Sequence, residues 1–223
     1  MIPDNKKLDV FHQMAYFASL KKYAIQQILK LEIPLTSNKE TLMNIMYGTY
    51  FIYLVALIDF LQEKKLLSCE EIIEFLKSKN NLLYIRNLRN SIVHRGLEVS
   101  SAGATLKNHP KLVVPLAPKE VVDKHGKNKY FSFTSNLLQT VIICEQVNHF
   151  CLQIIEKNNL AEYPDDTEEE FKNRHKNDSF IPDCFKTEEY LDLIWKSYQS
   201  QVADLHKNNV QKFLSYFYTK NLF

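Results

Sequence analysis

Apolar residues recur at helical spacing along most of this chain. The first such segment runs from Leu8 to Leu31 and should end near Ile33-Pro34, because the residue before a proline avoids helical geometry. The second, from about Lys39 to Lys65, is apolar on nearly all sides, which predicts a helix at the centre of a bundle. Ser37 or Asn38 is expected to cap its first turn.

Two shorter helical segments follow. Ser68 and Glu71 have the spacing of a capping box and should begin a third helix that ends near Lys79. A fourth helix is predicted from about Asn81 to Arg95. Gly96 is well placed to end it, since glycine readily adopts the left-handed backbone found just beyond many helices.

The pattern changes after the fourth helix. Residues 98–133 contain three prolines, two glycines and two β-rich pieces, 111–115 and 129–134. These features predict an irregular insertion that holds a small β-hairpin.

Helical spacing returns from Ser135 to about Lys157. An acidic loop is predicted over 159–186, and a last helix over 187–219. The chain is therefore expected to be a single all-α domain spanning 1–223.

Composition fits a globular protein with its own core. The chain has 223 residues, 45% of them hydrophobic, which is enough for a core without disulfides or metal. Its four cysteines show no C-x-x-C spacing, so neither a metal site nor a cofactor is expected. Cys144 and Cys151 lie seven apart in an apolar helical segment, which is typical of core positions.

Two features predict a cytoplasmic protein outside the membrane. The first ten residues lack the apolar run of a signal peptide, and reduced cysteines suit the cytosol. The most apolar stretch, Met43 to Leu61, contains Asn44, Thr49 and Asp59. We therefore interpret it as a buried core helix and not as a membrane span.

Charge is unevenly distributed although the net charge is only +2. Residues 75–119 hold eight Lys or Arg and one acid, whereas 159–192 hold eleven acids and four Lys or Arg. This split is compatible with one basic face for a polyanion. The alternative is a set of ordinary solvated charges.

The fourth helix carries the residues with the clearest chemistry. On a wheel of 100° per residue, Ile85, Leu88 and Ile92 form its core face, and Arg89 lies at the edge of that face. Asn90 and His94 share the adjacent flank, together with Arg86. Arg89 and His94 point roughly 140° apart on an ideal helix, so they converge only if His94 occupies the last turn.

These groups suit cleavage of a phosphodiester. A guanidinium binds phosphate through several donors and stays charged. An imidazole, with a reference pKa of about 6.5, can take or give a proton near neutral pH. RNA supplies its own nucleophile, the 2′-hydroxyl, so this chemistry requires no metal.

The run Arg89-Asn90-Ser91-Ile92-Val93-His94 resembles the R-x4-6-H motif of the HEPN superfamily, in its four-residue form. The resemblance implies an α-helical bundle, a metal-independent endoribonuclease, and a homodimer that brings two motifs into one cleft. It implies that Arg89 and His94 are the catalytic pair and that Asn90 orients phosphate or imidazole. It also implies a toxin or phage-defence effector, with an antitoxin or another regulatory partner.

One position departs from part of that family. Some members carry a tyrosine two residues after the histidine, and a paired antitoxin modifies that tyrosine. Gly96 stands at that position here, so this form of regulation is not expected.

Neighbouring residues have predicted supporting roles. Arg86 and Arg95 could contact RNA phosphates. Asp59, a carboxylate in an apolar helix, is expected either to hold Arg89 or His94 in position or to be solvated near a helix end. Four aromatic residues could stack on bases or pack in the core: Tyr84, Tyr130, Phe131 and Phe133.

A second functional class stays open. A HEPN-like bundle need not be catalytic, because some members only bind. In that alternative the chain is a helical module that binds nucleotide, RNA or a partner protein, and Arg89 and His94 are structural.

Overall fold

The computed structural model describes residues 4–34, 36–95, 103–106, 109–161, 167–179 and 181–218. Side chains are described for all of these except 4–5, 94–95, 103–106, 109–110 and 198–207.

The structure is mainly α-helical, as predicted. The helices are α1 (Asp4–Ile28), α2 (Ser37–Glu63), α3 (Cys69–Leu76), α4 (Lys79–Arg95), α5 (Leu137–Cys144), α6 (Val147–Lys157), α7 (Glu168–Asn177) and α8 (Glu188–Ser215), with a short 3-10 turn at Asp183–Phe185. The strands are β1 (Gly103–Leu106), β2 (His109–Pro115), β3 (Glu120–Val122) and β4 (Lys129–Phe131).

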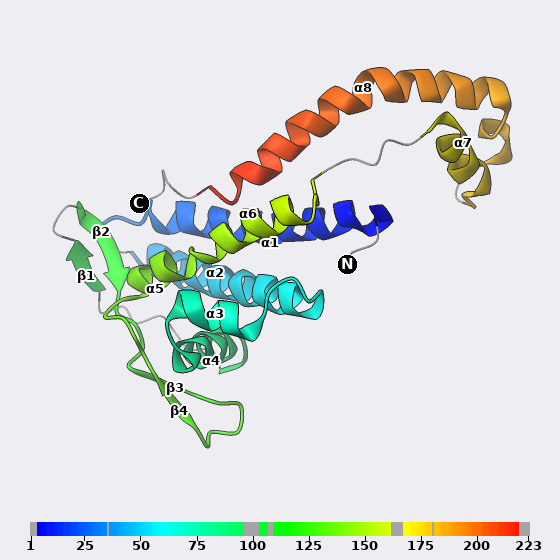
Figure 1. Cartoon of the computed structure of the whole chain (residues 1–223). Helices are drawn as coiled ribbons and strands as arrows, with labels where there is room; N and C mark the ends of the chain where they lie inside the picture. The colour runs from blue at the N-terminus through cyan, green and yellow to red at the C-terminus, as the bar shows by residue number, and fades with distance from the viewer. Residues whose placement is uncertain are drawn as a thin grey trace.

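Helix α2 is the centre of the bundle (Figure 1). It packs against α1 on one side and α4 on another, and α3 joins α4 and α5. Most of its large apolar side chains are buried, among them Tyr47, Phe51 and Leu54. By length and composition α2 could cross a membrane, but 56% of its most apolar window is buried inside the protein. Such burial is what the sequence predicted for a core helix.

Local capping signals explain where the early helices begin. Thr36, and not Ser37 or Asn38 as predicted, caps α2, because its side chain accepts a hydrogen bond from the Lys39 amide. The predicted capping box of Ser68 and Glu71 is confirmed at the start of α3. That helix ends at Leu76, where Lys77 takes a left-handed backbone.

The described part of the insertion between α4 and α5 contains two antiparallel strand pairs. The predicted β-rich pieces do not pair with each other: 111–115 lies in β2 and pairs with β1, while 129–131 lies in β4 and pairs with β3. The β3–β4 hairpin packs on α4 and projects from the bundle (Figure 1). Residues 96–102, and with them the predicted end at Gly96, lie outside the described part.

The second half of the chain agrees with one prediction and corrects another. The segment from Ser135 to about Lys157, where helical spacing was predicted, forms two helices, α5 and α6, separated by a turn at Glu145 and Gln146. The acidic loop predicted over 159–186 contains α7, because Thr167 and Glu170 form a capping box and Phe171 is buried. Acids in the first turn and bases in the last turn also favour this helix.

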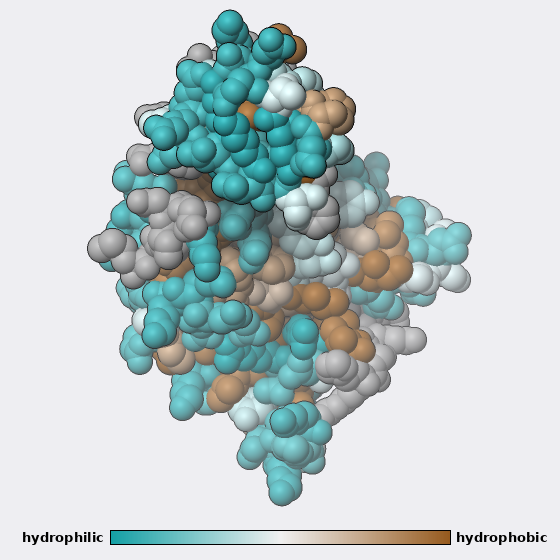
Figure 2. All heavy atoms as spheres, turned by 90° about the vertical axis from the view of Figure 1, so that its right-hand side faces the viewer, coloured by the Kyte–Doolittle hydropathy of each residue, from teal (hydrophilic) through white to brown (hydrophobic). Residues whose placement is uncertain are grey.

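Helices α7 and α8 form an arm on one end of the molecule. The last part of α8 packs on α1, whereas its first part extends beyond the bundle and carries α7 (Figure 1). Figure 2 shows this end: the arm is mostly hydrophilic, and apolar residues gather on the body beneath it.

Candidate functional site

Helix α4 is held against the core by one apolar face. Tyr84, Ile85 and Leu88 are fully buried, and Ile92 packs against the same core. The predicted core face of Ile85, Leu88 and Ile92 is therefore confirmed.

Two contacts show that α4 runs antiparallel to α2. Arg86 meets Asp59 and Gln62, late in α2, whereas Ile92 lies opposite Gly48, early in α2. A Cβ atom on Gly48 would come within 3.1 Å of the Ile92 Cγ2 atom. The absence of a side chain at Gly48 thus lets the two helices approach closely, and the C-terminal end of α4 lies beside the first half of α2.

Asp59 pairs with Arg86 and not with Arg89. The Arg86 Nη2 atom donates to Asp59 Oδ1 at 2.7 Å and to Gln62 Oε1 at 2.6 Å. Asp59 is more than half exposed, so the charge of this ion pair faces water. Of the alternatives predicted for Asp59, the link to Arg89 is not formed, because the antiparallel register places Asp59 opposite the residue one turn earlier. Asp59 is solvated near the end of α2, as the other alternative predicted, and a link to His94 lies outside the described part.

Arg89 is bound differently. Its Nη1 atom donates to Asn90 Oδ1 at 2.9 Å, and its Nε atom is buried without a hydrogen-bond partner. No carboxylate among the described residues pairs with this half-buried guanidinium. Its positive charge is therefore held in place by a neutral amide and stays available to an anion.

His94 and Arg95 occupy the last turn of α4. Their side chains lie outside the described part, so the predicted pairing of His94 with Arg89 is not tested. The backbone places Asn90 one helical turn before His94 on the same face, and Arg89 about 7.5 Å before His94 along the axis. Cationic side chains are favourable at this helix end, because its last carbonyls carry partial negative charge.

Asn44 on α2 is a polar residue to which we assigned no role from sequence. Its Oδ1 atom is buried and has no hydrogen-bond partner. It lies one turn before Gly48, and the antiparallel register therefore places it level with the last turn of α4. A buried acceptor without a hydrogen-bond partner is unusual in a folded protein. The sequence feature that indicates this position is the side-chain carboxamide of Asn44 within an otherwise apolar helix.

The aromatic residues divide between core and surface. Tyr84 is buried, packs edge-to-face on Phe133 and donates a hydrogen bond to the Pro118 carbonyl. Tyr130 and Phe133 are partly buried against the core. Phe131, on β4, is 63% exposed, so it is the one of the four placed to stack on a base.

Among the residues that the structure describes, no cluster of three or more His, Cys, Asp or Glu side chains could hold a metal ion. Cys144 and Cys151 are buried, as predicted, and burial raises the pKa of the Cys151 thiol to about 12. Cys69 and Cys184 are exposed.

Comparisons with protein families, with curated proteins and with solved structures found no match for this chain.

Proposed function

We propose that this protein is a metal-independent endoribonuclease of the HEPN type, with its site at the C-terminal end of α4. One observation carries the proposal. Arg89 has a guanidinium that no described carboxylate neutralises, and it lies on the helix that ends with His94. Arg86, one turn earlier, is neutralised by Asp59 and serves as an internal contrast.

In the proposed reaction, the RNA supplies the nucleophile. His94 takes the proton of the 2′-hydroxyl or protonates the leaving 5′-oxygen. Arg89 stabilises the charge that develops on the phosphorane, and the product carries a 2′,3′-cyclic phosphate. Asn90 positions the guanidinium through the hydrogen bond to Arg89 Nη1. Arg95 and the exposed lysines of the β3–β4 hairpin contact RNA phosphates.

The proposal includes a homodimer that places two copies of the motif in one cleft, one His94 acting as base and the other as acid. Two exposed apolar side chains support it. Val93, 42% exposed, is next to His94, and Ile45, 52% exposed, is next to Asn44. A second copy that packs over this end of α4 would cover both side chains. Uncontrolled RNA cleavage would halt growth, so we expect a cytoplasmic effector with a regulatory partner such as an antitoxin.

The test is incubation of the purified protein with RNA in EDTA. We expect cleavage that persists in EDTA and leaves 2′,3′-cyclic phosphate ends. Arg89→Ala should lower the cleavage rate about 100- to 1000-fold, the loss seen when one donor to a developing oxyanion is removed. His94→Ala should lower it about 100- to 10,000-fold, the range for one proton-transfer group.

Arg86→Ala is the matched control. It removes a guanidinium from the same helix but one that is already paired with Asp59. We expect its cleavage rate to stay within about threefold of the wild type, because this guanidinium is placed outside the proposed reacting groups. The ion pair that it loses is exposed and contributes about 1 kcal/mol or less to folding. If no RNA is cleaved, and if His94→Ala still binds a partner of the wild-type protein, the ribonuclease proposal is contradicted. The alternative of a non-catalytic binding module would then be favoured.

A further inference from the structure

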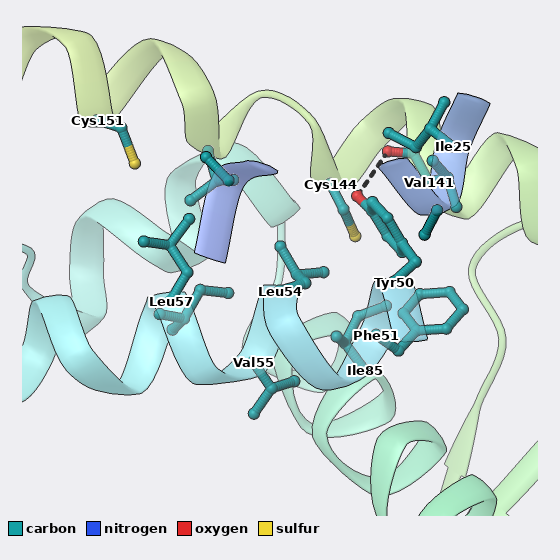
Figure 3. Packing of buried hydrophobic residues seen from close by; sticks show 14 of the residues in the cluster. Ile25, Tyr50, Phe51, Leu54, Val55, Leu57, Ile85, Val141, Cys144 and Cys151 are labelled. Carbon is teal, nitrogen blue, oxygen red and sulfur yellow. Dashed lines mark hydrogen bonds between the residues drawn. The ribbon is translucent and has the colours of Figure 1, made fainter. Parts of the chain in front are cut away.

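A polar cluster lies inside the core, remote in sequence from the motif on α4. Lys21 of α1 is 1% exposed, Glu145 at the turn between α5 and α6 is 6% exposed, and Asn148 of α6 is 3% exposed. Tyr50 of α2 is fully buried against them. The surroundings are apolar, and Figure 3 shows Tyr50 reaching past Cys144 toward the Val141 carbonyl.

The hydrogen bonds of the cluster join an amine, a carboxylate and a carboxamide. Lys21 Nζ lies 2.5 Å from Glu145 Oε1 and 3.0 Å from Asn148 Oδ1. Asn148 Nδ2 lies 2.8 Å from Glu145 Oε2. Because a carbonyl bond is about 1.23 Å long, the Asn148 carbonyl carbon is at most about 4.2 Å from the amine.

The cluster holds the groups that aminolysis of a carboxamide needs. The attack requires the amine in its neutral form, and Glu145 Oε1, 2.5 Å from Lys21 Nζ, is placed to accept the proton that the amine must lose. A neutral lysine amine is a nucleophile. Tyr50 donates to Glu145 Oε1 at 2.8 Å, and burial raises the pKa of its hydroxyl well above the ordinary value, so it remains a donor.

Glu145 contacts both nitrogen atoms that would exchange protons. One of its oxygens faces the attacking Lys21 nitrogen and the other faces the Asn148 nitrogen that would leave. A single carboxyl group can therefore accept a proton from the first nitrogen and donate one to the second. Exclusion of water protects the carboxamide from competing hydrolysis.

We propose that Lys21 and Asn148 form an intramolecular isopeptide bond, with Glu145 as the proton carrier. Lys21 Nζ attacks the Asn148 carbonyl carbon, the Nζ–C bond forms, and the C–Nδ2 bond breaks. The departing nitrogen gains a proton through Glu145 and leaves as ammonia, so an amine and an amide yield a new amide and ammonia without any oxidant. The bond joins α1 to α6 and is independent of the ribonuclease proposal.

The decisive experiment is the intact mass of the purified full-length protein under denaturing conditions. We expect a mass lower than that of the sequence by one ammonia. Proteolysis should release a branched peptide that joins the Lys21 segment to the Asn148 segment. A folded wild-type protein with the full sequence mass would overturn the proposal.

Variants assign the roles. Glu145→Gln keeps the size of the side chain but cannot carry the proton, so the folded protein should have its full sequence mass; a mass lower by one ammonia would remove Glu145 from the reaction. Lys21→Arg should also show the full mass. Asn148→Asp should lose one water in place of ammonia, because a carboxyl group then reacts with the amine. Circular dichroism shows whether each variant is folded. If a variant does not fold, the mass of the wild-type protein still decides the proposal.

Discussion

At the scale of single residues, two arginines on one helix have different surroundings. Arg86 donates to Asp59 and Gln62, whereas Arg89 donates to Asn90 alone among described residues. Both have a buried Nε without a partner, so the difference lies in charge neutralisation. Arg86 therefore links α4 to α2, whereas the charge of Arg89 can bind a phosphate.

This contrast yields a prediction for Asp59→Asn. Because Asp59 is more than half exposed and pairs with Arg86, its loss should lower the free energy of unfolding by about 1 kcal/mol or less. RNA cleavage should stay within about threefold of the wild type. Urea denaturation and a cleavage assay test both values. A loss of cleavage as large as that of Arg89→Ala would instead mean that Asp59 acts on the proposed site.

At the scale of elements, the close contact of α2 and α4 positions the end of α4. Gly48 faces Ile92, and a Cβ at that position already meets Ile92 at 3.1 Å. A large side chain there must push the helices apart or force Ile92 into a strained rotamer. Either change moves the residues that follow Ile92, including His94.

We therefore predict that Gly48→Leu destabilises the protein by about 1–3 kcal/mol, the usual cost of overpacking a core. Adding Ile92→Ala should recover part of that loss, because it opens the space that the leucine needs. Thermal or urea unfolding of the two single variants and the double variant gives the coupling energy. Simple additivity of the two single effects would show that Gly48 and Ile92 do not control this contact.

At the scale of the whole molecule, α7 is held on α8 both by the buried Phe171, whose ring contacts Trp195, and by ion pairs. Lys172 of α7 pairs with Glu168 and with Asp192 of α8, and Lys176 pairs with Glu188. Hydrogen bonds donated by Lys172 and Lys176 lower the pKa values of Asp192 and Glu188, and the bonds that Lys172 donates to Asp192 and Glu168 raise the pKa of Lys172. The packing of α7 on α8 therefore depends on pH and salt.

The sign of the pH dependence follows from these directions. Carboxyl groups with lowered pKa values stabilise the arm above their ordinary values of 3.8 and 4.5, and that contribution disappears as the pH falls below this range. The Lys172 contribution is complete below its ordinary 10.5 and disappears as the pH rises through its raised pKa. Attachment of α7 should thus be strongest between these limits.

Amide hydrogen exchange tests the pH dependence of the contact between α7 and α8, with the rates corrected for intrinsic exchange. Between pH 6 and pH 3, α7 amides should lose protection while α2 amides keep it. High salt at pH 6 should also lower the protection of the α7 amides. The variant Lys172→Met should show the same loss of protection at pH 6 without added salt. Equal protection of α7 under all these conditions would show that Phe171 packing, and not charge, holds the arm.

The proposed dimer belongs to the same scale. Ile45→Glu places a charge beside Asn44, on an exposed surface that the second chain of the proposed dimer would cover. We expect this variant to be folded, monomeric by sedimentation, and at least about tenfold slower in RNA cleavage, since about 1.4 kcal/mol is a factor of ten in an equilibrium. Ile142→Glu, at an exposed position of α5, is the matched control and should stay dimeric. A monomeric wild type that cleaves RNA would remove the dimer from the mechanism.

Features that depend on near neighbours can be predicted from the amino-acid pattern alone. The helix of Arg89 and His94, the capping box of Ser68 and Glu71, and the core face of α4 follow from helical spacing and local hydrogen bonds. Short-range sterics and amide geometry set these features, so a window of a few residues contains the information. The capping box of α7 was readable for the same reason and was missed because its segment is strongly acidic.

Contacts between residues far apart in the chain are visible in the folded protein alone. Asp59 contacts Arg86 because α2 and α4 run antiparallel with Gly48 against Ile92, a register that no local pattern encodes. Lys21 meets Glu145 and Asn148 across more than 120 positions because three helices share one core. Such contacts depend on how whole helix faces pack, and packing is a property of the assembled fold.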